Sequence, residues 1–333
     1  MRATPFYSIP FRGQPRTEAP RDRRSFVELC GRLEFEFEVR SAYLYVGSGQ
    51  LLVRPGPLQE PYWAFARRAG ELVIPGTGLK GAVRAVVEAI SNSCVPHAAK
   101  NERHRLERTP HERCAARQDG RPDAGNRKRR ELPPRLCPAC RIFGTTGYRG
   151  RVHFSDARPI GPVQREIVKI ADLWPPEPLD GRKFYRAGNF RPPRHPRPER
   201  NHRFVEAVPR GARFVSSLHF ENTAPAELSL VLRGLGLDRA SDPPGFRAAF
   251  AIKIGGAKPR CLGAVAVRPR ALFLIPTRGP DLLLALSRGG EPQRVEDLLG
   301  QWLANRSLLD EEIWKEFLKE AADSAGECPA GMY

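Results

Sequence analysis

The chain has 333 residues, and its 55 Lys and Arg against 37 Asp and Glu give a formal net charge of +18. So large a positive excess indicates a polyanionic partner such as nucleic acid, although a general contribution to solubility is the alternative. No run of about 18 apolar residues occurs, and the N-terminal residues lack the apolar region of a signal peptide, so we expect a cytoplasmic protein without a membrane span. In such a protein the seven cysteines favour a metal site over a disulfide framework.

The first part of the chain predicts an arm, a strand and a connection. Residues 1–27 are rich in Pro and Arg and show no periodicity, so we expect an N-terminal arm outside the hydrophobic core. Apolar residues alternate with charged ones over residues 33–40, which is the pattern of a half-buried strand. Residues 44–73 carry many glycines and prolines and predict a long irregular connection, a kind of segment that is often functional.

The stretch Ile74–Arg84, IPGTGLKGAVR, predicts the start of a helix over residues 77–92 with Thr77 as its N-cap. Apolar residues follow at helical spacing and define one buried face. Lys80 and Arg84 lie four residues apart on another face, where two cations could hold successive phosphates of a strand. The alternative is a surface helix with ordinary solvated cations, and the spacing alone favours that alternative. The stretch lacks the spacing of a Walker A loop.

Residues 94–140 have little apolar periodicity and many cations, so we expect an insertion that is held by something other than a hydrophobic core. The Cys137-Pro-Ala-Cys140 spacing offers two thiolates from one short loop, and zinc prefers four ligands in a tetrahedron. Cys94 and Cys114 complete a four-cysteine set for a structural zinc ion. Three histidines of the same segment are alternative ligands: His97, His104 and His111. A redox pair or simply buried thiols are the other interpretations.

The second half of the chain repeats the order of the first. A strand is predicted over residues 151–155, and an insertion dense in Pro and Arg follows over residues 157–212. The remaining predicted core elements are a strand over residues 214–220, a helix over 225–237, and strands over 250–254 and 264–275. This order predicts an α+β fold with a ferredoxin-like core, the sheet topology of RNA-recognition motifs. A helical segment over residues 291–333 completes the chain.

A glycine-rich loop, IGGAKPRCLG, separates the last two predicted strands. Glycines such as Gly255 and Gly256 let a backbone approach a polyanion closely, and Lys258 with Arg260 adds positive charge. The signal is weak by itself, because a glycine-rich hairpin turn has the same composition.

The sequence gives poor support for catalysis. Metal-free cleavage of RNA needs an acid or a base close to the strand. Residues 44–73 contain no Asp, and Glu60 and Glu71 are the only acids in that segment. His153 and Asp156 lie at the end of a predicted strand, where such a pair is more often structural.

Three motifs, in this order, resemble the RAMP superfamily of CRISPR effector proteins: IPGTGLKGAVR, CPACRIFGTTGYRGRVHFSDA and IGGAKPRCLGAV. The segment GRKFYRAGNF at Gly181–Phe190 is similar to one found in a branch of these proteins. The resemblance extends over roughly residues 30–275 and is strongest to the backbone subunits of type III effector complexes. It implies an RNA-recognition-motif-like domain over residues 28–290 with a zinc-bound insertion and a thumb at residues 165–212.

The resemblance also implies which residues contact RNA. The first helix would contact guide phosphates, and the glycine-rich loop would lie against the RNA backbone. The predicted RNA-binding residues are Lys80, Arg84, Arg149, Arg151, Gly255, Gly256 and Lys258, and the predicted zinc ligands are Cys94, Cys114, Cys137 and Cys140.

One departure from the family pattern bears on activity. Relatives that cleave target RNA carry an Asp in the loop before the IPG motif, and this chain has none there. The resemblance therefore predicts a guide-RNA-binding backbone subunit of a type III-like complex without cleavage activity of its own. Its partners would be guide RNA, complementary target RNA and other CRISPR effector subunits. The alternatives are an endoribonuclease with a site near residues 44–73 and a scaffold that contacts only proteins.

Overall fold

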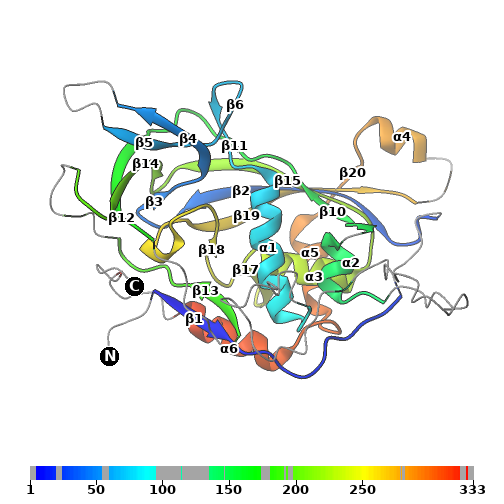
Figure 1. The fold of residues 1–333 in the computed structure, drawn as a ribbon. Coiled ribbons are helices and arrows are strands. Elements are labelled where there is room, and N and C mark those ends of the chain that lie inside the picture. The colour runs from blue at the N-terminus through cyan, green and yellow to red at the C-terminus, as the bar shows by residue number, and fades with distance from the viewer. Residues whose placement is uncertain are drawn as a thin grey trace, which may run out of the picture.

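The computed structural model has a mixed α+β architecture in which strands predominate (Figure 1). It describes residues 5–19, 25–54, 60–94, 114, 135–145, 147–173, 181–190, 193, 198–277, 279, 282–322 and 328. None of the helices in this part of the chain is long and apolar enough to span a membrane.

A central antiparallel sheet has the strand order β10-β15-β2-β19-β18. Its two long inner strands, β2 (Leu29–Val39) and β15 (Arg213–Thr223), lie beside each other, and β19 (Ala264–Ile275) flanks β2 on the other side. The alternation that predicts β2 is explained by burial, because its odd-numbered residues from Leu33 to Val39 point into the core and are at most 1% exposed. The short strands β10 (Val152–Phe154) and β18 (Ile252–Lys253) lie at the edges, and β11 (Arg158–Pro159) and β20 (Glu291–Gln293) extend the sheet.

Two helices, α1 (Gly76–Ile90) and α3 (Pro225–Gly234), lie side by side in front of this sheet (Figure 1). Their contact is close at Gly234, where a Cβ would lie 2.8 Å from Val83 Cγ1 and 2.9 Å from Val87 Cγ2. A glycine is therefore required for the two helices to approach this closely. The core elements thus follow the order β2, α1, β10, β15, α3, β19, as the periodicity predicts.

A second sheet, with the order β12-β14-β5-β4, corrects one expectation. Two of its strands, β4 (Gly47–Val53) and β5 (Pro61–Phe65), come from residues 44–73, so the prediction of an irregular connection there is wrong. Strands β12 (Glu166–Ala171) and β14 (His202–Pro209) come from the insertion at residues 157–212, and the short strand β3 (Tyr43–Leu44) also pairs with β14. Each half of the sheet supplies the pairing partner of the other, which no local pattern in either segment can reveal.

The N-terminal segment is part of the core, which corrects the expectation of an arm outside it. Its strand β1 (Phe6–Ile9) pairs antiparallel with β13 (Arg182–Tyr185). Tyr7 is 8% exposed and Ile9 is fully buried, and the Tyr7 ring meets the edge of Phe317 with 6.0 Å between centroids. Figure 1 shows β1 and β13 beside helix α6 (Glu311–Ala322), which carries Phe317.

The remaining elements are short or peripheral. They are β3 (Tyr43–Leu44), β6 (Arg67–Arg68), β7 (Glu71–Leu72), α2 (Pro138–Phe143), β8 (Gly144–Thr145), β9 (Tyr148–Arg149), β16 (Leu237–Ser241), β17 (Pro244–Ala248), η2 (Lys258–Arg260), α4 (Leu282–Ser287) and α5 (Val295–Ala304). Helices α5 and α6 bear out the prediction that the C-terminal segment is helical, and both bury an apolar face that includes a tryptophan.

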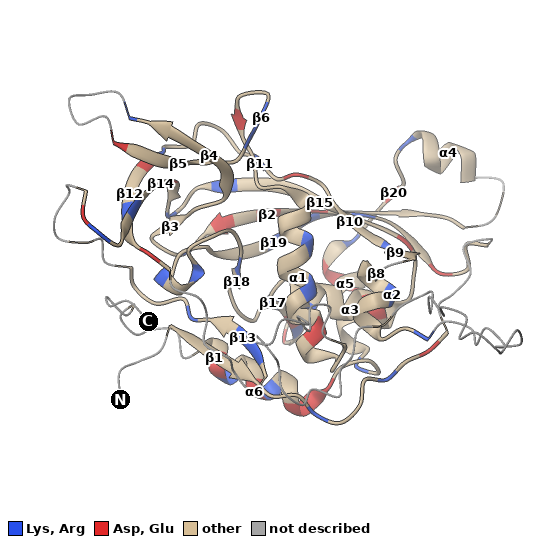
Figure 2. Ribbon diagram, in the orientation of Figure 1, with Lys and Arg blue, Asp and Glu red and all other residues tan. Residues whose placement is uncertain are grey.

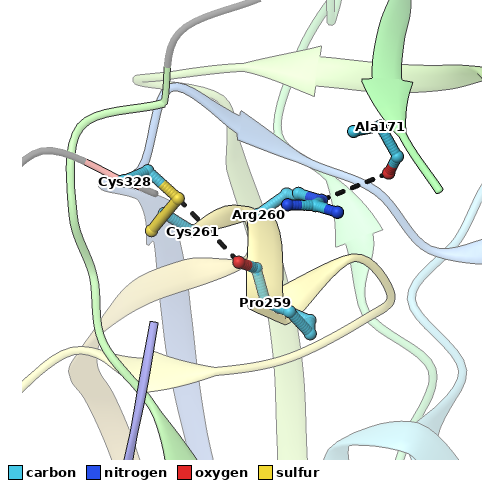
Figure 3. Close-up of a disulfide and its surroundings, with 5 residues drawn as sticks. All are labelled: Ala171, Pro259, Arg260, Cys261 and Cys328. Atoms are coloured by element: carbon cyan, nitrogen blue, oxygen red, sulfur yellow. Dashed lines mark hydrogen bonds between the residues drawn. A yellow bond between two sulfur atoms is a disulfide. The ribbon is translucent and has the colours of Figure 1, made fainter. Parts of the chain in front are cut away.

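A disulfide joins Cys261, at the end of the glycine-rich loop, to Cys328 near the C-terminus (Figure 3). The backbone N–H of Cys328 also donates to the carbonyl of Asn189 at 3.0 Å. Next to the disulfide, Arg260 Nε donates to the Ala171 carbonyl at 3.2 Å and ties the same loop to the end of β12. The expectation that the cysteines avoid disulfides is therefore wrong for this pair.

Candidate RNA-binding and metal sites

The N-terminus of α1 is fixed against the sheet by a glycine and a carboxylate. A Cβ at Gly76 would lie 2.1 Å from the carbonyl oxygen of Phe154, so only glycine allows the helix to start this close to β10. The N-cap is Pro75 and makes no side-chain hydrogen bond, so the prediction of Thr77 as the cap is wrong. Asp156 Oδ1 instead accepts the N–H of Gly76 at 2.8 Å, supplying from another segment the acceptor that a capping side chain usually provides.

Lys80 lies on α1 within a group of positive charges, and Figure 2 shows Lys and Arg along this helix. Burial lowers the pKa of Lys80, and the charges of Arg84 and Arg149 lower it further. Within the described ranges no carboxylate forms an ion pair with Lys80. The structure thus brings three predicted RNA-binding residues together, and their mutual repulsion would be relieved by a bound polyanion.

Arg84 is largely engaged within the protein. Its Nε donates to Glu88 Oε1 at 2.6 Å, and its Nη1 donates to the Gly144 carbonyl at 2.9 Å. Its Nη2 lies 3.8 Å from Cys140 Sγ. Burial opposes the charge of Arg84, but the hydrogen bond and charge of Glu88 raise its pKa overall. Arg84 therefore joins α1 to the cysteine cluster and has little freedom left for a phosphate.

Arg151 is buried, so it is poorly placed for direct contact with RNA. It is 2% exposed, and its Nη1 donates to the Asn222 carbonyl at 2.6 Å while Nε donates to the hydroxyl of Tyr148 at 2.9 Å. Arg149, two residues earlier in β9, is exposed. Residues 149 and 151 belong to the same motif, but only Arg149 has a surface position.

The four predicted zinc ligands come together in space although they are up to 46 residues apart. Their sulfur atoms all lie within 4.8 Å of one another, with 3.4 Å between Cys94 and Cys140 and 3.6 Å between Cys137 and Cys94. A tetrahedral site with Zn–S bonds of about 2.3 Å places its sulfurs about 3.8 Å apart. The donor set and its spacing therefore fit zinc. The alternative ligands His97, His104 and His111 lie outside the described residues.

Hydrogen bonds around the cluster fix the segments that carry its thiols. Cys94 follows the end of α1, and the hydroxyl of the preceding residue, Ser93, accepts the N–H of Ala139 at 3.1 Å in the first turn of α2. The backbone N–H of Cys137 points to Cys114 Sγ at 3.4 Å. Such outer contacts orient metal ligands and tune their affinity.

The glycine-rich loop closes the hairpin between β18 and β19. Gly255 has a φ of +75°, and a Cβ there would lie 2.1 Å from the carbonyl oxygen of Tyr45. The N–H of Gly256 donates to the same carbonyl at 2.8 Å. Gly255 thus has an internal reason to be glycine, in agreement with the hairpin alternative raised by the sequence. Lys258 lies on the same loop, and burial lowers its pKa.

The acids considered for catalysis have different positions. Glu60 is 5% exposed, and its Oε1 has no hydrogen-bond partner in the described part of the chain. Asp156 caps α1 and also pairs with Arg68 at 3.1 Å. Sequence reasoning missed this capping role, and it also missed Lys253, an apparently ordinary strand lysine whose Nζ is buried. The alternation of AIKI places Lys253 opposite the buried Ile252 and Ile254, so it gives no signal of this burial.

The family model of the RAMP superfamily matches residues 36–264, which is more than half of the chain, and the chain therefore belongs to the RAMP superfamily. The matched range starts in β2, ends at the start of β19 and includes α1. No curated protein matches the chain. The resemblance carried by the three motifs is thus confirmed for the superfamily, and membership supports a CRISPR-associated, RNA-binding role.

Proposed function

We propose that the chain is a guide-RNA-binding backbone subunit of a type III-like CRISPR ribonucleoprotein that does not itself cleave target RNA. The observation that carries the proposal is the group of positive charges at Lys80 and Arg149 on a chain with a net charge of +18. Lysine and arginine neutralise phosphates without reading bases, so binding should be salt-sensitive and weakly dependent on sequence. The superfamily match supports RNA as the polyanion.

The proposed core is ferredoxin-like, as in RNA-recognition motifs. Support comes from the order β2, α1, β10, β15, α3, β19 along the chain and from the spatial order β10-β15-β2-β19. In that arrangement the two strands that follow the helices lie at the outside, and the helices pack together in front of the sheet (Figure 1). The segment at residues 157–212 is then the thumb, and its strands β12 and β14 contribute to the second sheet.

The cysteine cluster is proposed to hold a structural zinc ion through four thiolates: Cys94, Cys114, Cys137 and Cys140. A set of four protein ligands leaves no open position for a substrate, so the ion would hold the segments together without taking part in chemistry. Their spacing within 4.8 Å is the observation that supports it. Other partners of the subunit would be complementary target RNA and neighbouring effector subunits.

The test is RNA affinity measured over a range of salt concentrations. Lys80→Ala with Arg149→Ala should weaken binding at least about tenfold and reduce the magnitude of the salt slope by roughly 1.4, since each single-strand phosphate contact contributes about 0.7. Lys315→Ala with Lys319→Ala is the matched control, because it removes two exposed positive charges from α6. Equal affinities and slopes for the two double variants would contradict the proposed phosphate contacts.

Two rival functions have distinct outcomes in the same preparation. An endoribonuclease with a site near residues 44–73 would cut the bound RNA, and Glu60→Gln would abolish the cutting. A scaffold that contacts only proteins would bind no RNA, and the Lys80→Ala with Arg149→Ala variant would then behave like the unmodified chain. The proposal expects intact RNA bound by the unmodified chain.

A further inference from the structure

A cavity of about 280 Å³ lies between α1, β13, the β18 region and α6. Helix α1 contributes small side chains, including Ala82 and Ala85, which leave room beside the helix. Ligand sites in proteins are typically about 300–1,000 Å³, so this volume suits one small molecule or one unit of a polymer. The cavity is formed by segments from all parts of the chain and exists only in the folded protein.

Three lysines line this cavity: Lys183, Lys253 and Lys258. Among the described residues that line it, none is Asp or Glu. Like charges around one space repel one another, and burial weakens the screening by water. The cavity therefore has the electrostatic character of an anion site.

Lys253 is the strongest indication of a missing partner. Its Nζ is buried, and no hydrogen bond to it is found in the part of the chain that the structure describes. Burial lowers the pKa of Lys253 to about 7, and the charge of Lys258 contributes in the same direction. A buried ammonium without a partner is costly, and an anion beside it would restore both the charge and the hydrogen bonds.

The cavity also has aromatic walls. Tyr185 of β13 and Phe250, just before β18, both line it and are half-buried. Aromatic side chains stack on nucleobases, and the ammonium of lysine is a compact charge that suits a phosphate. A nucleotide has both parts, a flat ring system and a phosphate, in one molecule of the appropriate size.

This cavity is separate from the charges at Lys80. Ala82 follows Lys80 by two residues and so lies about 200° around the helix from it. Figure 1 agrees, since α2 lies on one side of α1 and β18 with β13 lies on the other. Arg84 contacts the segment of α2, whereas the cavity opens on the flank of β18 and β13.

We propose that this cavity binds a single nucleotide, with its phosphate at Lys253 and Lys258 and its base against Tyr185 and Phe250. The proposal does not depend on RNA binding at Lys80, because the cavity would recognise one base and one phosphate. A free nucleotide and a nucleotide of a bound RNA both present these two groups. No reaction is implied, since the cavity supplies binding groups only.

The experiment is calorimetric titration of the full chain, freed of nucleic acid, with AMP, adenosine and inorganic phosphate. AMP should bind once per chain and at least tenfold more tightly than either of its parts. Lys253→Gln keeps the size and polarity of the side chain but removes its charge, and it should weaken AMP binding at least tenfold. AMP that fails to bind, or that binds the Lys253→Gln variant equally well, overturns the proposal.

A second pair of variants does not depend on a buried residue. Ala85 is exposed at the rim of the cavity on α1, and both Glu and Gln are good helix formers. Ala85→Glu adds a negative charge there and should weaken AMP binding at least fivefold more than Ala85→Gln does. Equal effects of the two substitutions would overturn the assigned position of the phosphate.

Two further measurements separate this cavity from the proposed RNA-binding site at Lys80 and Arg149 and identify the source of the nucleotide. Lys80→Ala with Arg149→Ala should leave AMP affinity unchanged. RNA binding at Lys80 and Arg149 can therefore be disproved while the cavity is still found to bind AMP. Loss of AMP binding in that variant would contradict a separate site. Competition with a saturating RNA oligonucleotide then distinguishes the sources. If the oligonucleotide displaces AMP, the cavity binds a nucleotide of the RNA. If AMP stays bound, the cavity binds a free nucleotide.

Discussion

At the scale of single residues, similar arginines and lysines of the motifs have different roles. Lys80 has a surface position without a carboxylate partner in the described residues, Arg84 joins α1 to the cysteine cluster, and Arg151 is buried under β15. The partners of Arg84 lie 56 and 60 residues away in sequence, so its spacing from Lys80 could not reveal them. Long-range contacts of this kind decide whether a cation is structural or available to RNA.

The contact of Arg84 with Cys140 leads to a prediction on metal retention. Arg84→Ala should lower zinc affinity by about 10–100-fold, the usual effect of removing an outer contact to a metal ligand. Lys80→Ala, one turn earlier on α1, should leave zinc unchanged, and Cys137→Ser should abolish stoichiometric zinc. Elemental analysis of the folded fraction after dialysis against a chelator measures all three. Full zinc in Cys137→Ser would contradict the metal site, and full zinc in Arg84→Ala would contradict the supporting contact.

The burial of Lys253 predicts a pH-dependent stability. Its pKa of about 7 in the folded protein is below its ordinary value of 10.5, so the unfolded chain binds more protons between these two pH values. The penalty is therefore complete below about pH 7 and is relieved as pH rises towards 10.5. Lys253→Met should raise the free energy of unfolding by about 1–3 kcal/mol at pH 6 and by less at pH 9.

Urea denaturation of both proteins in buffers without phosphate gives this difference directly. Titrating groups shared by the two proteins largely cancel in the comparison, which isolates Lys253 and its neighbour Lys258. A gain that is the same at pH 6 and pH 9 would show that Lys253 stays charged in the fold.

At the scale of elements, the close contact between α1 and α3 predicts a sensitive glycine. Gly234→Ala places a Cβ within 3.0 Å of three Val83 and Val87 atoms and should lower the free energy of unfolding by about 1–3 kcal/mol. Gly81→Ala is the control, because a Cβ at this exposed position of α1 meets nothing within 4 Å. It should raise stability by about 0.5–1 kcal/mol. Urea denaturation in which Gly234→Ala is also stabilising would contradict the close packing of the two helices.

The elements with a clear period could be predicted from the sequence, and those defined by distant partners could not. Strand β2 and helices α1, α5 and α6 each bury one face, so their apolar residues recur with the period of the element. Strand β4 is largely exposed and contains GSGQLLV, so it has no alternation to find, and it pairs with β5 across a proline-containing connection. The pairing of β5 with β14 joins residues about 140 apart.

The candidate site was predictable to a similar extent. The four cysteines were found from the Cys137-Pro-Ala-Cys140 spacing and from their concentration in one polar segment, and the structure brings them together. The glycines of the motifs were identified, but not their reasons. Gly76 is needed for the approach to Phe154, and Gly255 for the approach to Tyr45, which are contacts between segments far apart in sequence.

At the scale of the whole molecule, distant segments enclose the central sheet and its helices. The N-terminal strand β1 pairs with β13, both lie beside α6, and the disulfide of Cys261 and Cys328 ties the C-terminal region to the glycine-rich loop. The single-nucleotide cavity lies where these segments meet α1. The proposed RNA-binding site at Lys80 lies on the other flank of α1, so this one helix positions both proposed sites.

We propose that the protein binds guide RNA, and the nucleic acid that copurifies with it tests this proposal. The chain is expressed together with its neighbouring genes and purified, its absorbance ratio is measured, and any bound RNA is sequenced. We expect a uniform short RNA with repeat-derived ends. Protein that is free of RNA would contradict it, and the net charge of +18 would then require a different polyanion.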